Sequence, residues 1–305
     1  MRALTEQDLH RLLDPVAVVE VIEQAFRRDY RSTAVLPART HMPIPGGILL
    51  MMPCYDSALP ALGVKLVTVT RTGIQAHYSL LDPATGTLLA AMEANWLTDL
   101  RTAATSAVAT RHLMRSGAST LGIFGTGRQA WAHLLVFQKL WSFRRVLVCG
   151  STPVATLDFC RRVAGELGLH AEPADHAACA AHADVICCCT TATEPLFDGS
   201  GLRPGTHLNL VGAFRPDTRE VDDLTIQRAR VVVDTCEGAL AEAGDLLIPL
   251  AGGAISRSHF LADLHELISG KTRVRTADDD ITLFKSVGCA LEDLVVAQLA
   301  FQEGC

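Results

Sequence analysis

The chain has 305 residues, and its 27 Lys and Arg against 33 Asp and Glu give a formal net charge of −6. This length suits about two domains, or one large α/β unit. Hydrophobic residues make up 49% and charged residues 20%, a globular mixture that excludes disordered, collagen-like and coiled-coil chains. The acidic balance provides no basic surface for nucleic acid or an anionic membrane.

The first residues, MRALTEQDLHRLLD, lack the apolar core and cleavage site of a signal peptide, and apolar stretches such as 46–53 are far shorter than the ~20 residues that span a bilayer. The cysteines are scattered, apart from the adjacent Cys187, Cys188 and Cys189, and no C-x-x-C pair predicts a zinc site. We therefore expect a cytoplasmic protein with reduced thiols, and no metal, membrane or nucleic-acid partner.

The N-terminal part predicts two helices and then a series of strands. Thr5 and Asp8 form a capping-box-like start, an apolar stripe at helical spacing follows to about residue 31, and Pro15 indicates a second helix after Asp14. Short β-type runs are expected at 48–52, 62–70, 77–82 and 87–92, with residues 82–86 as the turn between the last two. Residues 98–116, rich in alanine, predict a buried helix.

From residue 119 onward, strands alternate with helices. The expected strands are 119–124, 146–149, 170–173, 185–190, 206–211 and 230–234, with helices at 128–140, 154–167 and 176–183. This alternation predicts parallel βαβ units in an open, doubly wound sheet. A final helix at 287–301 has no strand partner, so we expect it to return to the N-terminal part.

A Gly-x-Gly-x-x-Ala motif, formed by Gly125, Gly127 and Ala130, lies between the first strand and helix of this series. In such a motif the first glycine makes a tight turn, the second lets the backbone approach a pyrophosphate, and the alanine lets helix and strand pack closely. The helix that begins near Arg128 would offer free N–H groups to the phosphates. This context favours a dinucleotide site over an ordinary glycine turn.

The second strand of the series ends in Gly150, Ser151 and Thr152. NAD-specific proteins carry an acidic residue near this point, which binds the ribose hydroxyls. Its absence leaves room for a 2′-phosphate, with Arg128 or Arg161 as the source of positive charge. We predict NADP(H) as the preferred cofactor and NAD(H) as the alternative, unless this loop is solvated and has no discriminating role.

Three basic residues are candidates for chemistry. Lys65 stands in a β-branched run and would lose hydration there, which lowers its pKa toward a useful acid–base range. The alternative is an edge-strand lysine that extends into water. Arg101 opens an apolar helix, where a cation is disfavoured unless an anion lies nearby. A bound carboxylate or phosphate shared with Arg39 would supply that anion, whereas the alternative is a pair of surface arginines joined to Asp99 or other acids.

Six stretches of the chain together resemble the ornithine cyclodeaminase/μ-crystallin family over nearly the full length. They are residues 63–65, 82–86, 97–104, 125–130, 211–220 and 284–294. The resemblance implies a homodimer of two-domain α/β subunits. Residues 1–116 plus 285–305 would build a split α+β domain for substrate binding and dimerisation, into which the Rossmann-type dinucleotide-binding domain, a doubly wound parallel sheet at 117–284, is inserted.

The resemblance also implies residue roles. Lys65 falls at the active-site lysine, and Arg39 and Arg101 fall at positions that bind the substrate carboxylate, so these three are the expected catalytic residues. His77 is expected as a further substrate contact. The expected cofactor-binding residues are Thr102, Gly125, Thr126, Gly127, Arg128, Gln129, Gly150, Ser151, Thr152, Thr190, Thr191, Val211, Gly212, Ala213 and Ser286.

One position departs from the cyclodeaminases of this family, which carry an aspartate after the fifth strand as the base for water attack and ammonia loss. Here that position falls on Phe214, and Asp217 lies three residues further. The Gly-Ala-Phe-x-Pro pattern looks more like the family members that reduce cyclic imines.

The resemblance therefore implies NAD(P)H-dependent reduction of a small cyclic imino acid, foremost Δ1-pyrroline-2-carboxylate to L-proline in proline metabolism, and secondly Δ1-piperideine-2-carboxylate to L-pipecolate. Three alternatives stay open. They are an ornithine or lysine cyclodeaminase, a reductase of acyclic imino acids, and a μ-crystallin-like protein that binds NADPH and a ligand without turnover.

Overall fold

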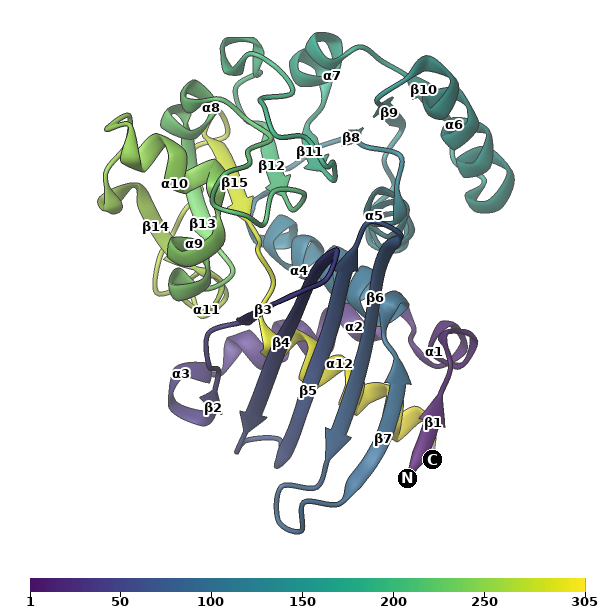
Figure 1. The fold of residues 1–305 in the computed structure, drawn as a ribbon. Coiled ribbons are helices and arrows are strands. Elements are labelled where there is room, and N and C mark those ends of the chain that lie inside the picture. Colours follow the sequence, from purple (N-terminus) through teal and green to yellow (C-terminus); the bar gives the residue numbers. More distant parts are fainter. Residues whose placement is uncertain (305) are drawn as a thin grey trace. The chain divides into compact units, whose positions relative to one another are not determined.

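The computed structural model describes residues 1–304, which form two compact units (Figure 1). One unit consists of Met1–Thr105 together with the segment from Gly288 onward, and the other consists of Ser106–Val287. The first boundary falls within helix α4 (Asn95–Leu113). Within the described residues, every helix is too short or too polar to cross a membrane.

Two helices lie near the start of the first unit, as the sequence predicts. Helix α1 (Glu6–Leu12) begins with a capping box in which the side chains of Thr5 and Asp8 each accept a hydrogen bond from the other residue's backbone N–H. Helix α2 (Pro15–Arg27) is capped by Asp14, whose carboxylate accepts two backbone N–H groups. A proline lacks the N–H that a continuous helix needs, so the break falls here.

The first unit contains a seven-stranded sheet, in the order β1-β7-β6-β5-β4-β2, with β3 paired to β4. The strands are β1 (Arg2–Leu4), β2 (Ala34–Val35), β3 (Thr40–Ile44), β4 (Gly47–Asp56), β5 (Ala61–Thr70), β6 (Gly73–Leu81) and β7 (Leu88–Glu93), and the short helix α3 (Tyr30–Thr33) precedes β2. The ladders from β3 to β7 are antiparallel, so alternate side chains point to opposite faces. The four predicted strands are confirmed as β4 to β7.

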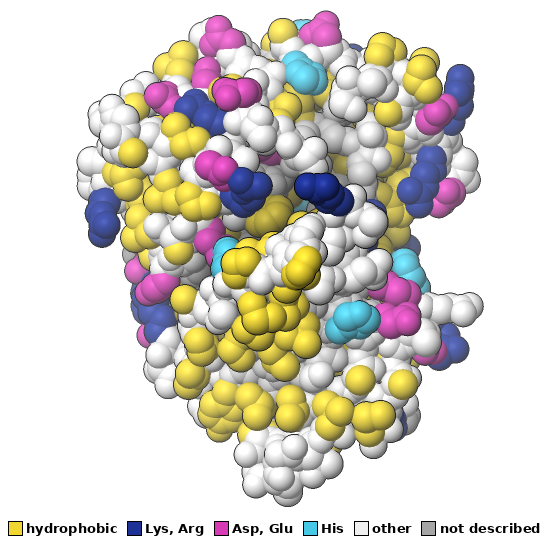
Figure 2. Space-filling model, viewed as in Figure 1, with side chains coloured by type: hydrophobic (Ala, Val, Ile, Leu, Met, Phe, Trp, Pro, Cys, Tyr) yellow, Lys and Arg dark blue, Asp and Glu magenta, His cyan; other side chains and the backbone are white. Residues whose placement is uncertain are grey.

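Helix α12 (Ala290–Glu303) packs against β4, β5 and β6 on one face of this sheet, together with α2 (Figure 1). In β5, Lys65 and Val67 are buried on this face, whereas Val64 and Leu66 point to the opposite face and stay partly exposed. Figure 2 shows that opposite face as a hydrophobic area over β4, β5 and β6. The core of the first unit therefore lies between the sheet and α12.

The second unit contains an eight-stranded sheet, parallel throughout, in the order β10-β9-β8-β11-β12-β15-β13-β14. Its strands are β8 (Thr120–Phe124), β9 (Arg145–Cys149), β10 (Ala171–Pro173), β11 (Val185–Cys188), β12 (His207–Leu210), β13 (Ala229–Val233), β14 (Phe260–Asp263) and β15 (Ile281–Lys285). The strand order reverses between β8 and β11, which is the arrangement of a doubly wound, Rossmann-type sheet and is the point where such sheets bind ligands. The predicted fold class is confirmed.

Helices connect these strands. They are α5 (Arg128–Leu140), α6 (Pro153–Leu167), α7 (His176–His182), α8 (Asp223–Arg228), α9 (Cys236–Glu242), α10 (Gly244–Ala251) and α11 (Leu264–Ile268), with two short 3-10 turns at Gly199–Gly201 and Arg257–His259. Six of the eight strands match predicted ones. Strands β14 and β15 were not predicted, and β15 inserts between β12 and β13.

Candidate active site and cofactor-binding edge

Lys65 lies in the middle of β5, on the face that α12 covers, and 1% of its side chain is exposed. Its Nζ donates a hydrogen bond to Oδ1 of Asp293 at 2.7 Å. Burial, followed by the charge of Arg101, lowers the pKa of Lys65 to about 8, although Asp293 acts in the opposite direction. Because β5 lies between β4 and β6, the alternative of an edge-strand lysine is wrong.

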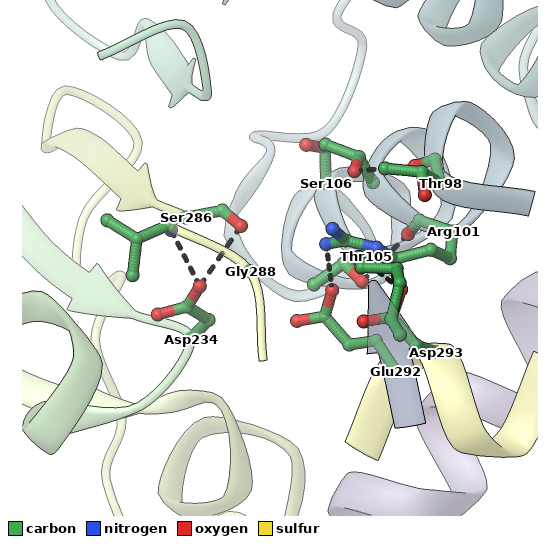
Figure 3. Close-up of polar contacts among 12 residues, drawn as sticks. Thr98, Arg101, Thr105, Ser106, Asp234, Ser286, Gly288, Glu292 and Asp293 are labelled. Carbon is green, nitrogen blue, oxygen red and sulfur yellow. Dashed lines mark hydrogen bonds and ion pairs between the residues drawn. The ribbon is translucent and has the colours of Figure 1, made fainter. Parts of the chain in front are cut away.

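Arg101 lies on α4 and is also buried. Its Nε donates to Oδ1 of Asp293 at 2.9 Å and its Nη1 donates to Oε2 of Glu292 at 2.6 Å, as Figure 3 shows. Burial disfavours the charged form, but Asp293 and then Glu292 outweigh it and raise the pKa of Arg101 above its usual value. The guanidinium is therefore a fixed positive charge inside the unit, not a surface group.

Arg39, in the loop before β3, is half-buried, and its Nη2 donates to the carbonyl of Gly288 at 3.1 Å. The charges of Arg101 and Arg39 lower the pKa of Lys65, whereas Asp293 raises the pKa values of both Lys65 and Arg101. A ligand carboxylate suits such a group, because guanidinium groups bind carboxylates through two parallel hydrogen bonds.

His77 does not share this face of the sheet. In the β5–β6 ladder Lys65 lies opposite Tyr78, and His77 lies opposite Leu66. Side chains alternate along a strand, so His77 points away from the face of Lys65, and it is exposed. The structure thus separates His77 from the lysine, and its expected role in substrate binding stays a prediction.

The turn after β8 has the features of a phosphate-binding loop. Gly125 has φ +106°, and a Cβ added to it would lie 2.5 Å from the carbonyl oxygen of Cys189, so only glycine fits. A Cβ on Gly127, the N-cap of α5, would meet nothing within 4 Å, and no side chain caps this helix. A phosphate could therefore approach the N-terminus of α5 closely at Gly127, and this chain's residues fit a dinucleotide.

The loop after β9 offers hydroxyl groups and no carboxylate. Ser151 is exposed, and Thr152 caps α6 by accepting a hydrogen bond from the backbone N–H of Ala155 at 3.2 Å. Of the two arginines predicted to supply charge, Arg161 pairs with its neighbour Asp158 at 2.8 Å. The other, Arg128, is the first residue of α5.

A buried network joins the segments that follow β11 and β12. The carboxylate of Glu220 accepts hydrogen bonds from the backbone N–H and the hydroxyl of Thr190, at 2.8 and 2.7 Å, and from the N–H of Gly212 at 2.8 Å. Asp245 accepts from the N–H of Glu220 at 2.6 Å and from Nζ of Lys285 at 2.8 Å. Burial, followed by Asp245, raises the pKa of Glu220. The network holds two predicted cofactor-binding segments together.

The remaining predicted cofactor residues divide into two groups. Residues 125–129, 150–152, 190–191 and 211–213 all follow the carboxyl ends of β8, β9, β11 and β12. Ser286 donates to Oδ2 of Asp234 at 3.1 Å (Figure 3), and Thr102, on α4, donates to the carbonyl of Thr98 at 2.8 Å. Both hydroxyls are thus engaged within the protein.

Several side chains of these sites were not predicted as functional. They are Glu220, Asp245 and Lys285 in the second unit and Asp293 in the first. One signal was available in the sequence, since Lys285 ends an apolar run just as Lys65 interrupts one. The carboxylates gave no such signal, because their spacing follows no catalytic motif.

The expected position of the cyclodeaminase base holds no carboxylate. Phe214 occupies it and is 36% exposed. The side chain of Asp217 is 63% exposed, and its two oxygens accept hydrogen bonds from Arg215 at 3.0 and 2.5 Å. The hydrogen bond from Arg215 lowers the pKa of Asp217. Asp217 is therefore an ion-paired surface carboxylate in this structure, which is unlike a base prepared for water attack.

Known proteins resemble the whole chain. The model of the ornithine cyclodeaminase/mu-crystallin family matches residues 2–303. The ketimine reductase mu-crystallin of Mus musculus is 39% identical over 274 residues, which cover 87% of this chain and 84% of that protein. Thermococcus litoralis Δ1-pyrroline-2-carboxylate reductase, solved with NADH and L-proline, is 35% identical with a TM-score of 0.96, covering 100% and 97% of the two chains. An archaeal alanine dehydrogenase dimer with bound NAD is 26% identical with a TM-score of 0.94, covering 100% and 96%.

Proposed function

Because the chain belongs to the ornithine cyclodeaminase/mu-crystallin family and is a nicotinamide-dependent imine reductase within it, we propose that its substrate is a small cyclic imino acid. Δ1-Pyrroline-2-carboxylate, reduced to L-proline, is the first candidate, and Δ1-piperideine-2-carboxylate is the second. The buried group of Lys65, Arg101 and Asp293 carries this proposal. It combines a proton donor of lowered pKa, Lys65, with a guanidinium, Arg101, that can bind the carboxylate of the substrate. Proline metabolism and a cytoplasmic location are part of the same proposal.

In the proposed reaction, Arg39 and Arg101 hold the substrate carboxylate and thereby orient the imine carbon. Lys65 donates a proton to the ring nitrogen, and Asp293 keeps the ammonium group in place. When bound, the reduced nicotinamide supplies the hydride that the imine carbon accepts. Reduction needs no base for water attack, which agrees with Phe214 at the cyclodeaminase position.

The test measures oxidation of NADPH and NADH with Δ1-pyrroline-2-carboxylate, beside ammonia release from ornithine with NAD. Oxidation without ammonia supports the reductase. Ammonia and proline formed from ornithine would mean a cyclodeaminase, and a preference for acyclic imino acids would favour the alanine dehydrogenase-like alternative. Tight cofactor binding without any turnover would favour a ligand-binding protein.

We propose that NADP(H) is preferred, because the loop after β9 has exposed hydroxyls and no carboxylate. Ser151→Asp should raise the KM for NADPH at least about tenfold by like-charge repulsion, and leave the KM for NADH nearly unchanged. Steady-state kinetics with both cofactors would measure this, with Ser258→Asp, an exposed position elsewhere in the same unit, as the control. An equal rise in the KM for NADPH and for NADH would contradict a 2′-phosphate site at this loop.

The pH dependence of reduction tests the role of Lys65. A proton donor works only while protonated, so kcat/KM should be level below the Lys65 pKa of about 8 and fall about tenfold per pH unit above it. Asp293→Asn removes the carboxylate that favours the ammonium form, so the fall should move to lower pH. Asp158→Asn, at an exposed ion pair, is the control. A rate that rises through this range would instead indicate a base.

We also propose a homodimer formed through the face of the sheet opposite α12. The partly exposed side chains there are largely apolar and contiguous: Leu49, Met51, Pro53, Tyr55, Leu62, Val64, Leu66 and Leu81. Soluble monomers rarely expose contiguous apolar areas of this kind, and a second copy would cover it. Light scattering should give twice the subunit mass of 32.7 kDa, and a monomer at that mass would contradict the proposal.

A further inference from the structure

One short segment, residues 288–293, contacts both arginines of the proposed carboxylate site. The carbonyl of Gly288 accepts a hydrogen bond from Nη2 of Arg39 at 3.1 Å. Glu292 and Asp293 accept from Nη1 and Nε of Arg101, at 2.6 and 2.9 Å. Arg39 and Arg101 lie far apart in the sequence, so this segment supplies the common contact that fixes them within one unit.

The backbone of Gly288 lies directly against the guanidinium of Arg101. A Cβ added to Gly288 would lie 2.6 Å from Nη1, 3.0 Å from Nη2 and 3.2 Å from Cζ, and these are the three nearest atoms. Gly288 also has φ +81°, a conformation that residues with a Cβ rarely adopt. Both the space and the backbone conformation therefore require glycine here.

The contacts of Arg101 leave one nitrogen for a ligand. Its Nε and Nη1 are taken by the two carboxylates, whereas Nη2 donates no hydrogen bond to any residue that the structure describes. Nη2 is also one of the atoms that a Cβ at position 288 would push against. A side chain at position 288 would thus displace Nη2 of Arg101, the nitrogen that would donate a hydrogen bond to the substrate carboxylate.

We propose that Gly288 is a positioning residue that sets the spacing of Arg39 and Arg101 for one substrate carboxylate. The carbonyl of Gly288 orients the guanidinium of Arg39. Because Gly288 has no side chain, the guanidinium of Arg101 can lie directly against its α-carbon. The inference rests on the proposed function, since it concerns the same carboxylate. It assigns substrate affinity to a residue that would not itself touch the substrate.

Gly288→Ala tests the proposal, with Gly86→Ala as a matched control. Gly86 lies in the same unit and has φ +70°, and a Cβ there would meet nothing within 4 Å. Both variants therefore place an alanine in an unfavourable backbone conformation, but only Gly288→Ala also brings a Cβ against Arg101. We expect Gly288→Ala to weaken binding of pyrrole-2-carboxylate, a planar unreactive analogue, and to raise the KM of the imino acid, both about 10- to 100-fold. Gly86→Ala should change neither value, and both variants should bind NADPH as the wild type does.

Equal analogue affinity in Gly288→Ala and Gly86→Ala would overturn the inference while leaving the reductase proposal intact. Loss of NADPH binding in Gly288→Ala alone would also overturn it, because the effect would not be specific to the carboxylate. If Gly288→Ala does not fold, Glu292→Gln changes the neighbouring contact of the same segment with Nη1 of Arg101 without backbone strain, and an unchanged analogue affinity in that variant would contradict a positioning role of the segment. A wild-type protein that neither reduces the imino acid nor binds the analogue contradicts the proposed function itself.

Discussion

Replacing Lys65 with Met is expected to lower kcat for Δ1-pyrroline-2-carboxylate about 10²- to 10⁴-fold, the range that a positioned proton donor contributes. Methionine is unbranched and fills similar space in β5, so the sheet should remain intact. Asp293 keeps a partner in Arg101 after the change. Single-turnover kinetics would measure the chemical step, and fluorescence titration would measure NADPH binding.

The NADPH dissociation constant of Lys65→Met should equal that of the wild type. Lys139→Met, an exposed lysine on α5, is the control and should leave kcat unchanged. Wild-type turnover in Lys65→Met would disprove the proton-donor role, whatever the effect on stability.

Replacing Arg101 with Lys should lower kcat/KM for the imino acid about 10²-fold. A lysine keeps the positive charge inside the unit, but it lacks the planar fork that binds one carboxylate while meeting two others. The buried carboxylates of Glu292 and Asp293 would compete for its single ammonium group. Inhibition by pyrrole-2-carboxylate should weaken in parallel, and this is measured in the same assay.

Arg27→Lys provides the control for this substitution. Arg27 pairs with Glu23 at 2.6 Å on α2, in the same unit, and its side chain is 58% exposed. It should therefore tolerate the change. If Arg101→Lys retained full kcat/KM, positive charge alone would suffice at this position and the carboxylate geometry proposed here would be wrong.

Sequence patterns predicted those parts of the fold that depend on local chemistry. The break between α1 and α2 follows from Pro15 and the cap at Asp14, and the strands β8 to β13 follow from apolar runs bounded by turns. Strand β15 was not predicted, because its last residue is charged and its neighbours in the sheet, β12 and β13, lie far away in the sequence. Parallel pairing of that kind leaves no local signal.

The candidate site was predictable to a similar degree. Lys65 was recognisable because burying a charge inside a β-branched run costs free energy unless the charge is paired or used in chemistry. The contact of Asp293 with Lys65 and that of Glu292 with Arg101 gave no such signal, because both depend on where α12 packs in the folded unit. The role of Gly288 depends on a three-dimensional contact with Arg101, and periodicity or spacing carries no information about such a contact.

The split of the first unit has a consequence for protein synthesis. Residues 1–105 leave the ribosome long before α12, so at that time the β5 lysine has neither Asp293 beside it nor a helix over its face of the sheet. The second unit is continuous in sequence and has all its strands by residue 285. Nascent chains should therefore acquire a protease-resistant second unit first. The first unit becomes complete only when its last helix is translated, so the contact between Lys65 and Asp293 forms after the second unit has folded.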